Sequence, residues 1–82
     1  MTPRLRALGG RDVLQALTHP GFIVARTRAS HATLVRTTAT GDRQVLTVPL
    51  HKELAPGTLH AIYRQALKFV PADQLRPFYF HG

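Results

Sequence analysis

The stretch FIVARTR-AS-HATLVRTT at residues 22–38, followed by RQVLTV at 43–48, decides the fold of this chain. Its three runs are rich in β-branched residues, which pack well on a pleated sheet. Ala29-Ser30 and Gly41-Asp42 leave room only for short turns between the runs, and consecutive strands joined by short turns pair antiparallel. The sequence therefore predicts a three-stranded antiparallel meander over residues 22–28, 31–38 and 43–48.

One short helix is expected before this meander. Val13, Leu14 and Leu17 form an apolar pattern of about two turns, and Asp12 lies where a carboxylate favours a helix start. His19-Pro20-Gly21 should end the helix, because Pro20 lacks a backbone donor and Gly21 permits a reversal of the chain.

A longer helix is expected after the meander. Pro56-Gly57 leads to Thr58, the predicted N-cap, and apolar residues then recur at helical spacing up to Phe69 or Val70. One more helical turn could begin at residues 71–73. The predicted fold is an α+β domain of order α-β-β-β-α, with the helices packed on one face of the sheet and the other face open.

Length and composition limit the classes of protein to which the chain can belong. Its 82 residues fit one domain, residues 1–82, and the absence of cysteine excludes disulfides and thiolate metal sites. No apolar run approaches the roughly eighteen residues of a membrane span, and the start has no apolar core of a signal peptide. We therefore expect a soluble, cytoplasmic protein that does not associate with membranes.

The charge gives the first indication of function. Eleven Lys and Arg against four Asp and Glu leave a net charge of +7, which attracts polyanions, above all nucleic acid. An acidic protein partner is an alternative. A membrane surface is a weaker one, because the basic residues spread along the whole chain instead of gathering on one amphipathic helix.

His31 is the residue best placed for chemistry. Strand alternation puts His31, Thr33, Val35 and Thr37 on one face, the more polar and hence the open one, and Ala32, Leu34 and Arg36 on the other. A histidine among arginines can take the proton of a ribose 2′-hydroxyl while the cations stabilise charge on the phosphate oxygens. The alternative is a surface histidine with no chemical role.

The remaining candidates support this site. His51 is the first candidate for the acid, although a solvated His51-Lys52 loop pair is equally compatible with the sequence. The expected RNA contacts are Arg26, Arg28, Ser30, Arg36, Lys52 and Arg64. No metal site or other cofactor is expected, because the histidines lack ligand spacing and carboxylates are few.

Several of these pieces, taken in order, resemble the HicA family of bacterial toxins, also called YcfA-like proteins. The pieces are Gly21-Phe22, Arg26, Ser30-His31, Val48-Pro49-Leu50-His51 and Gly57-Thr58-Leu59 with Ile62. The resemblance covers roughly residues 11–70, which leaves 71–82 as a short C-terminal extension.

The resemblance implies a double-stranded-RNA-binding-like fold and a specific activity. Members of the family are mRNA interferases, which are endoribonucleases of type II toxin–antitoxin pairs, and the family's functional histidine falls on His31. The implied partners are mRNA and a HicB-like antitoxin that masks the active site.

One departure from the family pattern concerns the turn before His31. The family usually has glycine before the Ser-His pair, whereas this chain has Ala29. If the position requires a positive φ, alanine costs roughly 1 kcal/mol and could shift the turn that aims His31. A non-catalytic RNA-binding module therefore remains the alternative function.

Overall fold

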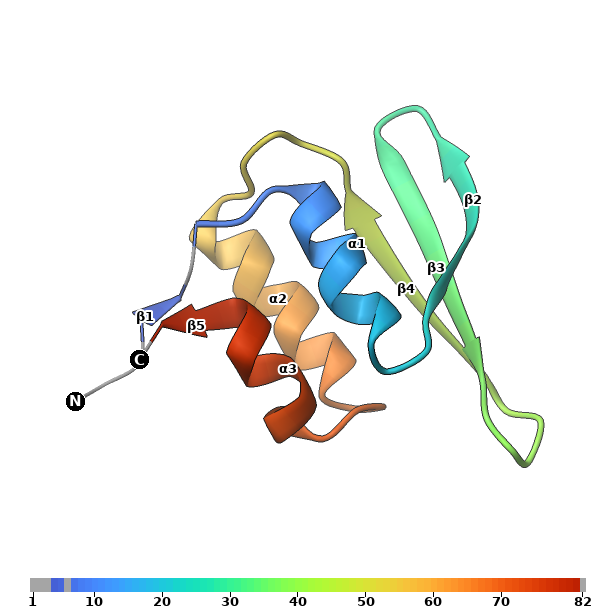
Figure 1. Cartoon of the computed structure of the whole chain (residues 1–82). Helices are drawn as coiled ribbons and strands as arrows, with labels where there is room; N and C mark the ends of the chain where they lie inside the picture. Colours follow the sequence, from blue (N-terminus) through green and yellow to red (C-terminus); the bar gives the residue numbers. More distant parts are fainter. Residues whose placement is uncertain (1–3, 6, 82) are drawn as a thin grey trace.

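The computed structural model describes residues 4–5 and 7–81, with side chains described over residues 7–76 (Figure 1). The fold is α+β, and the order predicted from the sequence, α-β-β-β-α, is confirmed for its central part. The elements are β1 (Arg4–Leu5), α1 (Gly10–Thr18), β2 (Ile23–Arg28), β3 (His31–Thr37), β4 (Arg43–Pro49), α2 (Pro56–Ala66), α3 (Ala72–Tyr79) and β5 (Phe80–His81).

The central sheet is the predicted antiparallel meander, with strand order β2-β3-β4. His31 pairs with Arg28 on one side and with Pro49 on the other, and the pairing of β3 with β4 continues without a break to Thr37 and Arg43. This register fixes which side chains share a face, because residues directly opposite one another point to the same side of a sheet.

A β-bulge interrupts the pairing of β2 with β3. The register shifts between Val24 and Arg26, so that Ala25 is the extra residue. Without the bulge, strict alternation from Arg28 would turn Ile23 toward the helices; with it, Ile23 pairs with Val35 and joins Arg28 on the open face. No residue type in the run FIVARTR indicates this bulge.

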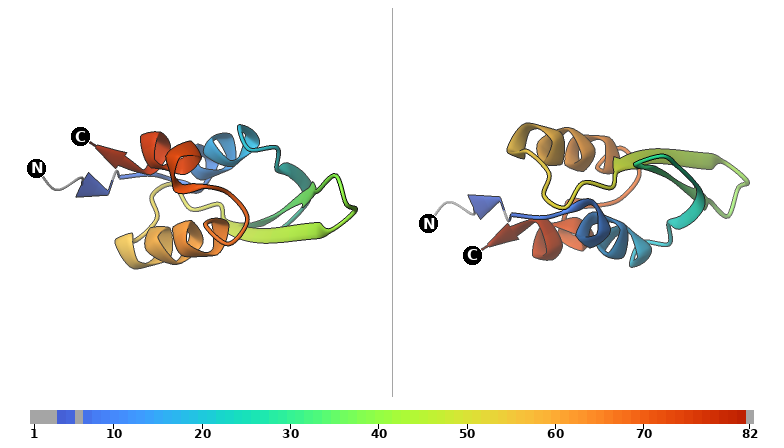
Figure 2. Two further views of the ribbon diagram at one scale, coloured as in Figure 1. Left: turned by 90° about the horizontal axis from the view of Figure 1, so that it is seen from below. Right: turned by 90° about the horizontal axis from the view of Figure 1, so that it is seen from above.

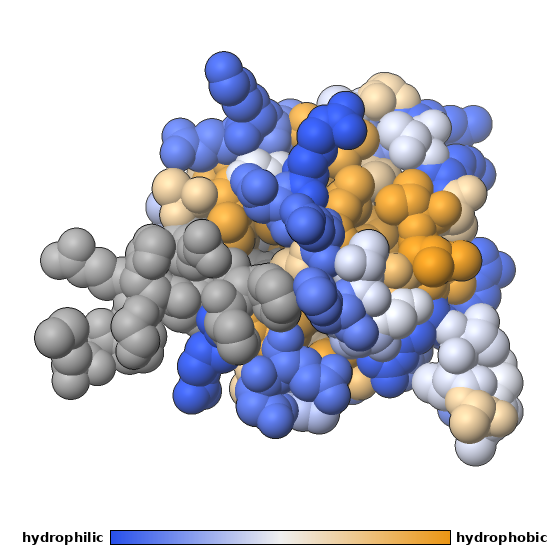
Figure 3. All heavy atoms as spheres, in the orientation of Figure 1, coloured by the Kyte–Doolittle hydropathy of each residue, from blue (hydrophilic) through white to orange (hydrophobic). Residues whose placement is uncertain are grey.

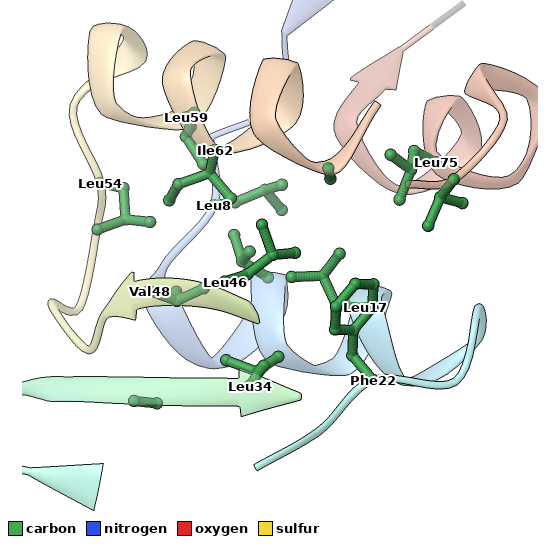
Figure 4. Close-up of a cluster of buried hydrophobic side chains, with 14 residues drawn as sticks. Leu8, Leu17, Phe22, Leu34, Leu46, Val48, Leu54, Leu59, Ile62 and Leu75 are labelled. Atoms are coloured by element: carbon green, nitrogen blue, oxygen red, sulfur yellow. The ribbon is translucent and has the colours of Figure 1, made fainter. Parts of the chain in front are cut away.

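The hydrophobic core lies between the sheet and the helices (Figure 4). Ala32 and Leu34 of β3 and Leu46 and Val48 of β4 are buried, whereas their neighbours along each strand are half-buried or exposed. The helices gather on one side of the sheet, and α3 packs against α1 (Figures 1 and 2). The predicted alternation is confirmed, and the face that carries His31 is the open one.

Helix α1 ends as its sequence predicts. The N–H of Gly21 donates to the carbonyl of Thr18 at 3.0 Å, and the N–H of Phe22 donates to that of Leu17 at 3.1 Å. Gly21 has φ +106°, so these bonds form a Schellman motif, in which the apolar residues at either end of the turn also pack together. Phe22 and Leu17 are both buried and contribute to the core.

The start of α1 docks on the end of β4 through two glycines. A Cβ on Gly9 would lie 2.1 Å from the carbonyl oxygen of Lys52, and one on Gly10 would lie 2.1 Å from that of Pro49. The N–H of Gly10 donates to the carbonyl of His51 at 2.9 Å, and the N–H of Gly9 donates to Asp12 Oδ2 at 2.8 Å. Only glycine permits this approach of two backbones.

The C-terminal part differs from the sequence prediction in its details. The N-cap of α2 is Ala55 and not Thr58, because Pro56 occupies the first turn, where a missing N–H costs nothing. The expected last turn is a helix, α3, of eight residues. A further pair of short strands, β1 and β5, pairs antiparallel; the side chains of the aromatic tail, residues 78–80, lie outside the described residues.

Candidate active site

His31 occupies the first position of β3, on the open face of the sheet. The pairing places Arg28 directly opposite on β2 and Pro49 directly opposite on β4, so the three form one row across the sheet. The imidazole is exposed, and no hydrogen bond or ion pair holds it within the part of the chain that the structure describes. Both ring nitrogens are therefore accessible to a ligand.

The next row along the open face is polar. Arg26 lies opposite Thr33, which in turn lies opposite Thr47. Arg26 and Arg28 thus stand side by side on β2, flanking the His31 end of the sheet. Every charged residue on β2, β3 and β4 is an arginine, since the four carboxylates of the chain are Asp12, Asp42, Glu53 and Asp73.

The turn before His31 has the strained conformation that the sequence comparison pointed to. Ala29 has φ +52°, in the left-handed region, and it alone of the two turn residues is positive. A positive φ at the first central residue is typical of a type II′ hairpin turn, in which glycine is usual at that place. The turn nevertheless closes: Arg28 pairs with His31, and the Ser30 carbonyl accepts from the N–H of Leu50 at 2.6 Å.

His51 and Lys52 lie just past the end of β4, in the segment that begins beside His31. They line a cleft of about 280 Å³ together with Arg11 and Asp12 of α1. The structure thus brings His51 and Lys52 to the same end of the sheet as His31, Arg28 and Ser30, as their proposed roles require.

Two of the expected RNA contacts lie elsewhere. Arg36 is an odd number of positions from His31, so it points toward the helices; its Cζ lies 5.7 Å from the centre of the Phe22 ring. Arg64 is exposed in the last turn of α2, in the helical layer. Neither side chain shares the open face with His31.

Two arginines that the sequence reading passed over belong to these surfaces. Arg43 lies opposite Thr37 at the far end of the open face, and Arg11 lines the cleft. The alternation of β4 could have placed Arg43, whereas the cleft depends on the docking of α1, which no local pattern reports.

An exposed apolar row crosses the open face next to these arginines. Ile23, Val35 and Val45 lie opposite one another, with Ile23 67% and Val45 46% exposed. Figure 3 shows apolar surface on the sheet side of the molecule, with hydrophilic side chains around it. We call Ile23, Val35 and Val45 the aliphatic row.

The described residues hold no group of three His, Asp or Glu side chains placed to bind a metal ion. Within the same part of the chain, every helix is too short or too polar to cross a membrane.

Comparison with known proteins agrees with this site. The family model described as the HicA toxin of bacterial toxin–antitoxin matches residues 10–67, more than half of the chain. The chain belongs to the HicA toxin family. The match runs from the start of α1 to the end of α2 and therefore includes the whole sheet and His31.

Membership in the HicA family establishes the biological class of the chain. It is the toxin side of a toxin–antitoxin pair, and the family implies a cognate antitoxin as its partner. No curated protein and no solved structure matches the chain.

Proposed function

We propose that this HicA toxin is an endoribonuclease that cleaves mRNA, with His31 as the general base. The observation that carries the proposal is the row of Arg28, His31 and Pro49: an exposed imidazole directly beside a guanidinium on an open face without carboxylates. A base that must reach a ribose hydroxyl needs this accessibility, and a phosphate needs a cation next to it.

The reaction follows from the chemistry of RNA. His31 removes the proton of the 2′-hydroxyl, whose oxygen attacks the adjacent phosphorus while the bond to the 5′-oxygen breaks. The leaving 5′-oxygen takes up a proton, for which His51 is the first candidate donor. The products are a 2′,3′-cyclic phosphate and a 5′-hydroxyl, and no metal ion or other cofactor takes part.

The arginines beside His31 hold the substrate in this scheme. Arg28 is near enough to His31 to neutralise the phosphate oxygens as negative charge grows on them, and Arg26 binds the strand one row further along. Ser30 and Lys52 contact the strand at the turn and at the cleft. Arg36 and Arg64 contribute only to RNA that extends beyond the open face.

Product analysis tests the mechanism. An RNA that the purified protein cleaves is compared with the same RNA carrying a single 2′-deoxynucleotide immediately 5′ to the cleavage site. We expect a cyclic phosphate end from the first and no cleavage at that site in the second. Cleavage that persists at the deoxynucleotide, or that leaves a 5′-phosphate, would rule out His31 as a base on the 2′-hydroxyl.

A binding-only descendant is the second candidate, and Ala29 is the observation that favours it. An alanine at φ +52° in the turn before His31 adds strain where the family usually has glycine. This candidate predicts RNA binding that weakens steeply with salt, without cleavage. The product analysis separates the two candidates.

The antitoxin partner is proposed to be HicB-like and to cover the open face. The aliphatic row supports this placement, because exposed β-branched side chains offer a protein an apolar anchor but give RNA bases no aromatic surface to stack on. The arginines around the row favour an acidic partner surface. Such a partner would cover His31 as well.

A further inference from the structure

We propose that the cleft between α1 and the end of β4 is a second phosphate site, which binds the RNA backbone next to the phosphate that is cleaved, with Arg11 and Lys52 as its ligands. This inference rests on the proposed function, since it assumes that an RNA strand lies across His31.

The charge of the cleft indicates an anionic ligand. Of its side chains, Arg11 and Lys52 are cations and His51 is a third group that can become one. The single carboxylate, Asp12, accepts the N–H of Gly9 at 2.8 Å and thus serves the helix start. Among the described residues, neither Arg11 nor Lys52 has an ion-pair partner.

The cleft is held in a fixed shape by its backbone. The contacts of Gly9 and Gly10 with Lys52 and Pro49 leave no space for a Cβ, and the hydrogen bond from Gly10 to His51 joins the two walls. Arg11 therefore faces the 50–52 segment without reorganisation of the main chain, which lowers the entropy lost on binding a ligand.

The cleft is also continuous with the candidate active site. Leu50 lines the cleft, and its N–H donates to the carbonyl of Ser30, the residue before His31. Pro49, one residue earlier, is the pairing partner of His31. An RNA strand that places one phosphate at Arg28 and His31 can thus pass the end of β4 and place a neighbouring phosphate at Arg11 and Lys52.

The size and polarity of the cleft suit a phosphate group better than a protein side chain. Its volume is about 280 Å³, and Leu50 is its only apolar side chain among ionisable ones. A phosphate accepts hydrogen bonds from a guanidinium and an ammonium together, and Arg11 supplies the geometrically defined donor pair.

The test measures binding of a single-stranded RNA that is 2′-O-methylated throughout, so that cleavage through the 2′-hydroxyl does not occur. Fluorescence anisotropy gives the affinity of the full chain and its variants over a series of salt concentrations. Each lost contact to a single strand lowers the slope of log K against log salt by about 0.7. We expect Arg11→Ala with Lys52→Ala to lower the slope by about 1.4.

Two controls give this test its specificity. Lys68→Ala with Arg76→Ala removes the same charge from exposed positions on the helical side and should leave the slope unchanged. Arg11→Lys should restore most of the slope at that position, because it keeps the charge. Circular dichroism confirms that all variants are folded.

An unchanged slope in the Arg11 and Lys52 double variant, or an equal loss in the control double variant, overturns the proposal. The absence of any binding by the wild-type chain does so too. Failure of the proposed function is a separate result: a wild-type chain that binds the methylated RNA normally but does not cleave unmodified RNA loses the nuclease activity and keeps the cleft.

Discussion

His31 is exposed, yet its position is set by three neighbouring structures. The turn at Ala29-Ser30 precedes it, Arg28 and Pro49 flank it, and the bond from Leu50 to Ser30 ties the turn to the end of β4. The backbone of the residue is thus fixed from both sides of the sheet while its ring stays accessible. A base that acts on a flexible strand benefits from such positioning.

Ala29 gives the first prediction at this scale. Replacing Ala29 with glycine should stabilise the protein by about 1 kcal/mol, because glycine adopts a positive φ without the clash of a Cβ. For a domain of this size the melting temperature should rise by roughly 4–8 °C. Thermal unfolding followed by circular dichroism measures the change.

Ala39 provides the matched control. It is an exposed turn residue whose φ is not positive, so Ala39→Gly should be neutral or destabilising. Equal effects of the two substitutions would show that the turn before His31 is not strained.

His51 gives a second prediction. If His51 protonates the leaving oxygen, His51→Ala should lower the rate of cleavage by about 10²–10⁴-fold, with the products unchanged and RNA binding nearly so. Single-turnover cleavage against anisotropy of methylated RNA measures the two separately. A parallel loss of rate and affinity would make His51 a binding residue instead.

At the scale of elements, the docking of α1 on β4 depends on Gly9 and Gly10. Gly10→Ala places a Cβ against the carbonyl of Pro49 and should destabilise the protein by about 1–3 kcal/mol. Gly57→Ala in the first turn of α2 is the control, because a Cβ there meets nothing within 4 Å and alanine favours a helix. Urea unfolding compares them; equal stabilities would refute the docking role.

The strands and their faces could be predicted from the sequence, because alternation reports directly on burial. The alternation of β3 placed His31 on the open face and Arg36 on the other, as the structure confirms. The bulge at Ala25 could not be predicted, since a bulge leaves no mark on residue type. The Gly9–Gly10 docking and the cleft also stayed hidden, because they depend on contacts between segments far apart in the chain.

The N-cap of α2 illustrates a competition between local signals. Thr58 is a good capping residue, but Pro56 is also suited to a first helical turn, and the helix begins at the proline. The site residues followed the same rule as the fold: those on strands were placed correctly, whereas Arg11 needed the tertiary structure.

At the scale of the whole molecule, the net charge of +7 and the aliphatic row must serve more than one partner. The arginines bind RNA, and the row is proposed to anchor the acidic antitoxin over the same face. Toxin activity and neutralisation should therefore be separable by substitution.

Ile23→Asn tests this separation. It should weaken binding of the antitoxin encoded beside this chain by at least about 30-fold, the loss typical of a buried anchor, while RNA cleavage stays within a few-fold of wild type. Val24→Asn is the control, because Val24 is also exposed but pairs with the core residue Leu34 and so points to the other face. Calorimetry with the purified antitoxin gives both affinities; equal losses would place the partner elsewhere.

The central claim is that the chain is a ribonuclease toxin whose chemistry resides at His31. The most direct measurement is inducible expression of the wild type beside His31→Ala, with growth and the integrity of total mRNA followed together and equal levels of folded protein verified. The account predicts growth arrest with loss of mRNA in the wild type alone. Growth arrest with mRNA loss in a well-folded His31→Ala protein, or no effect of the wild type, would contradict it.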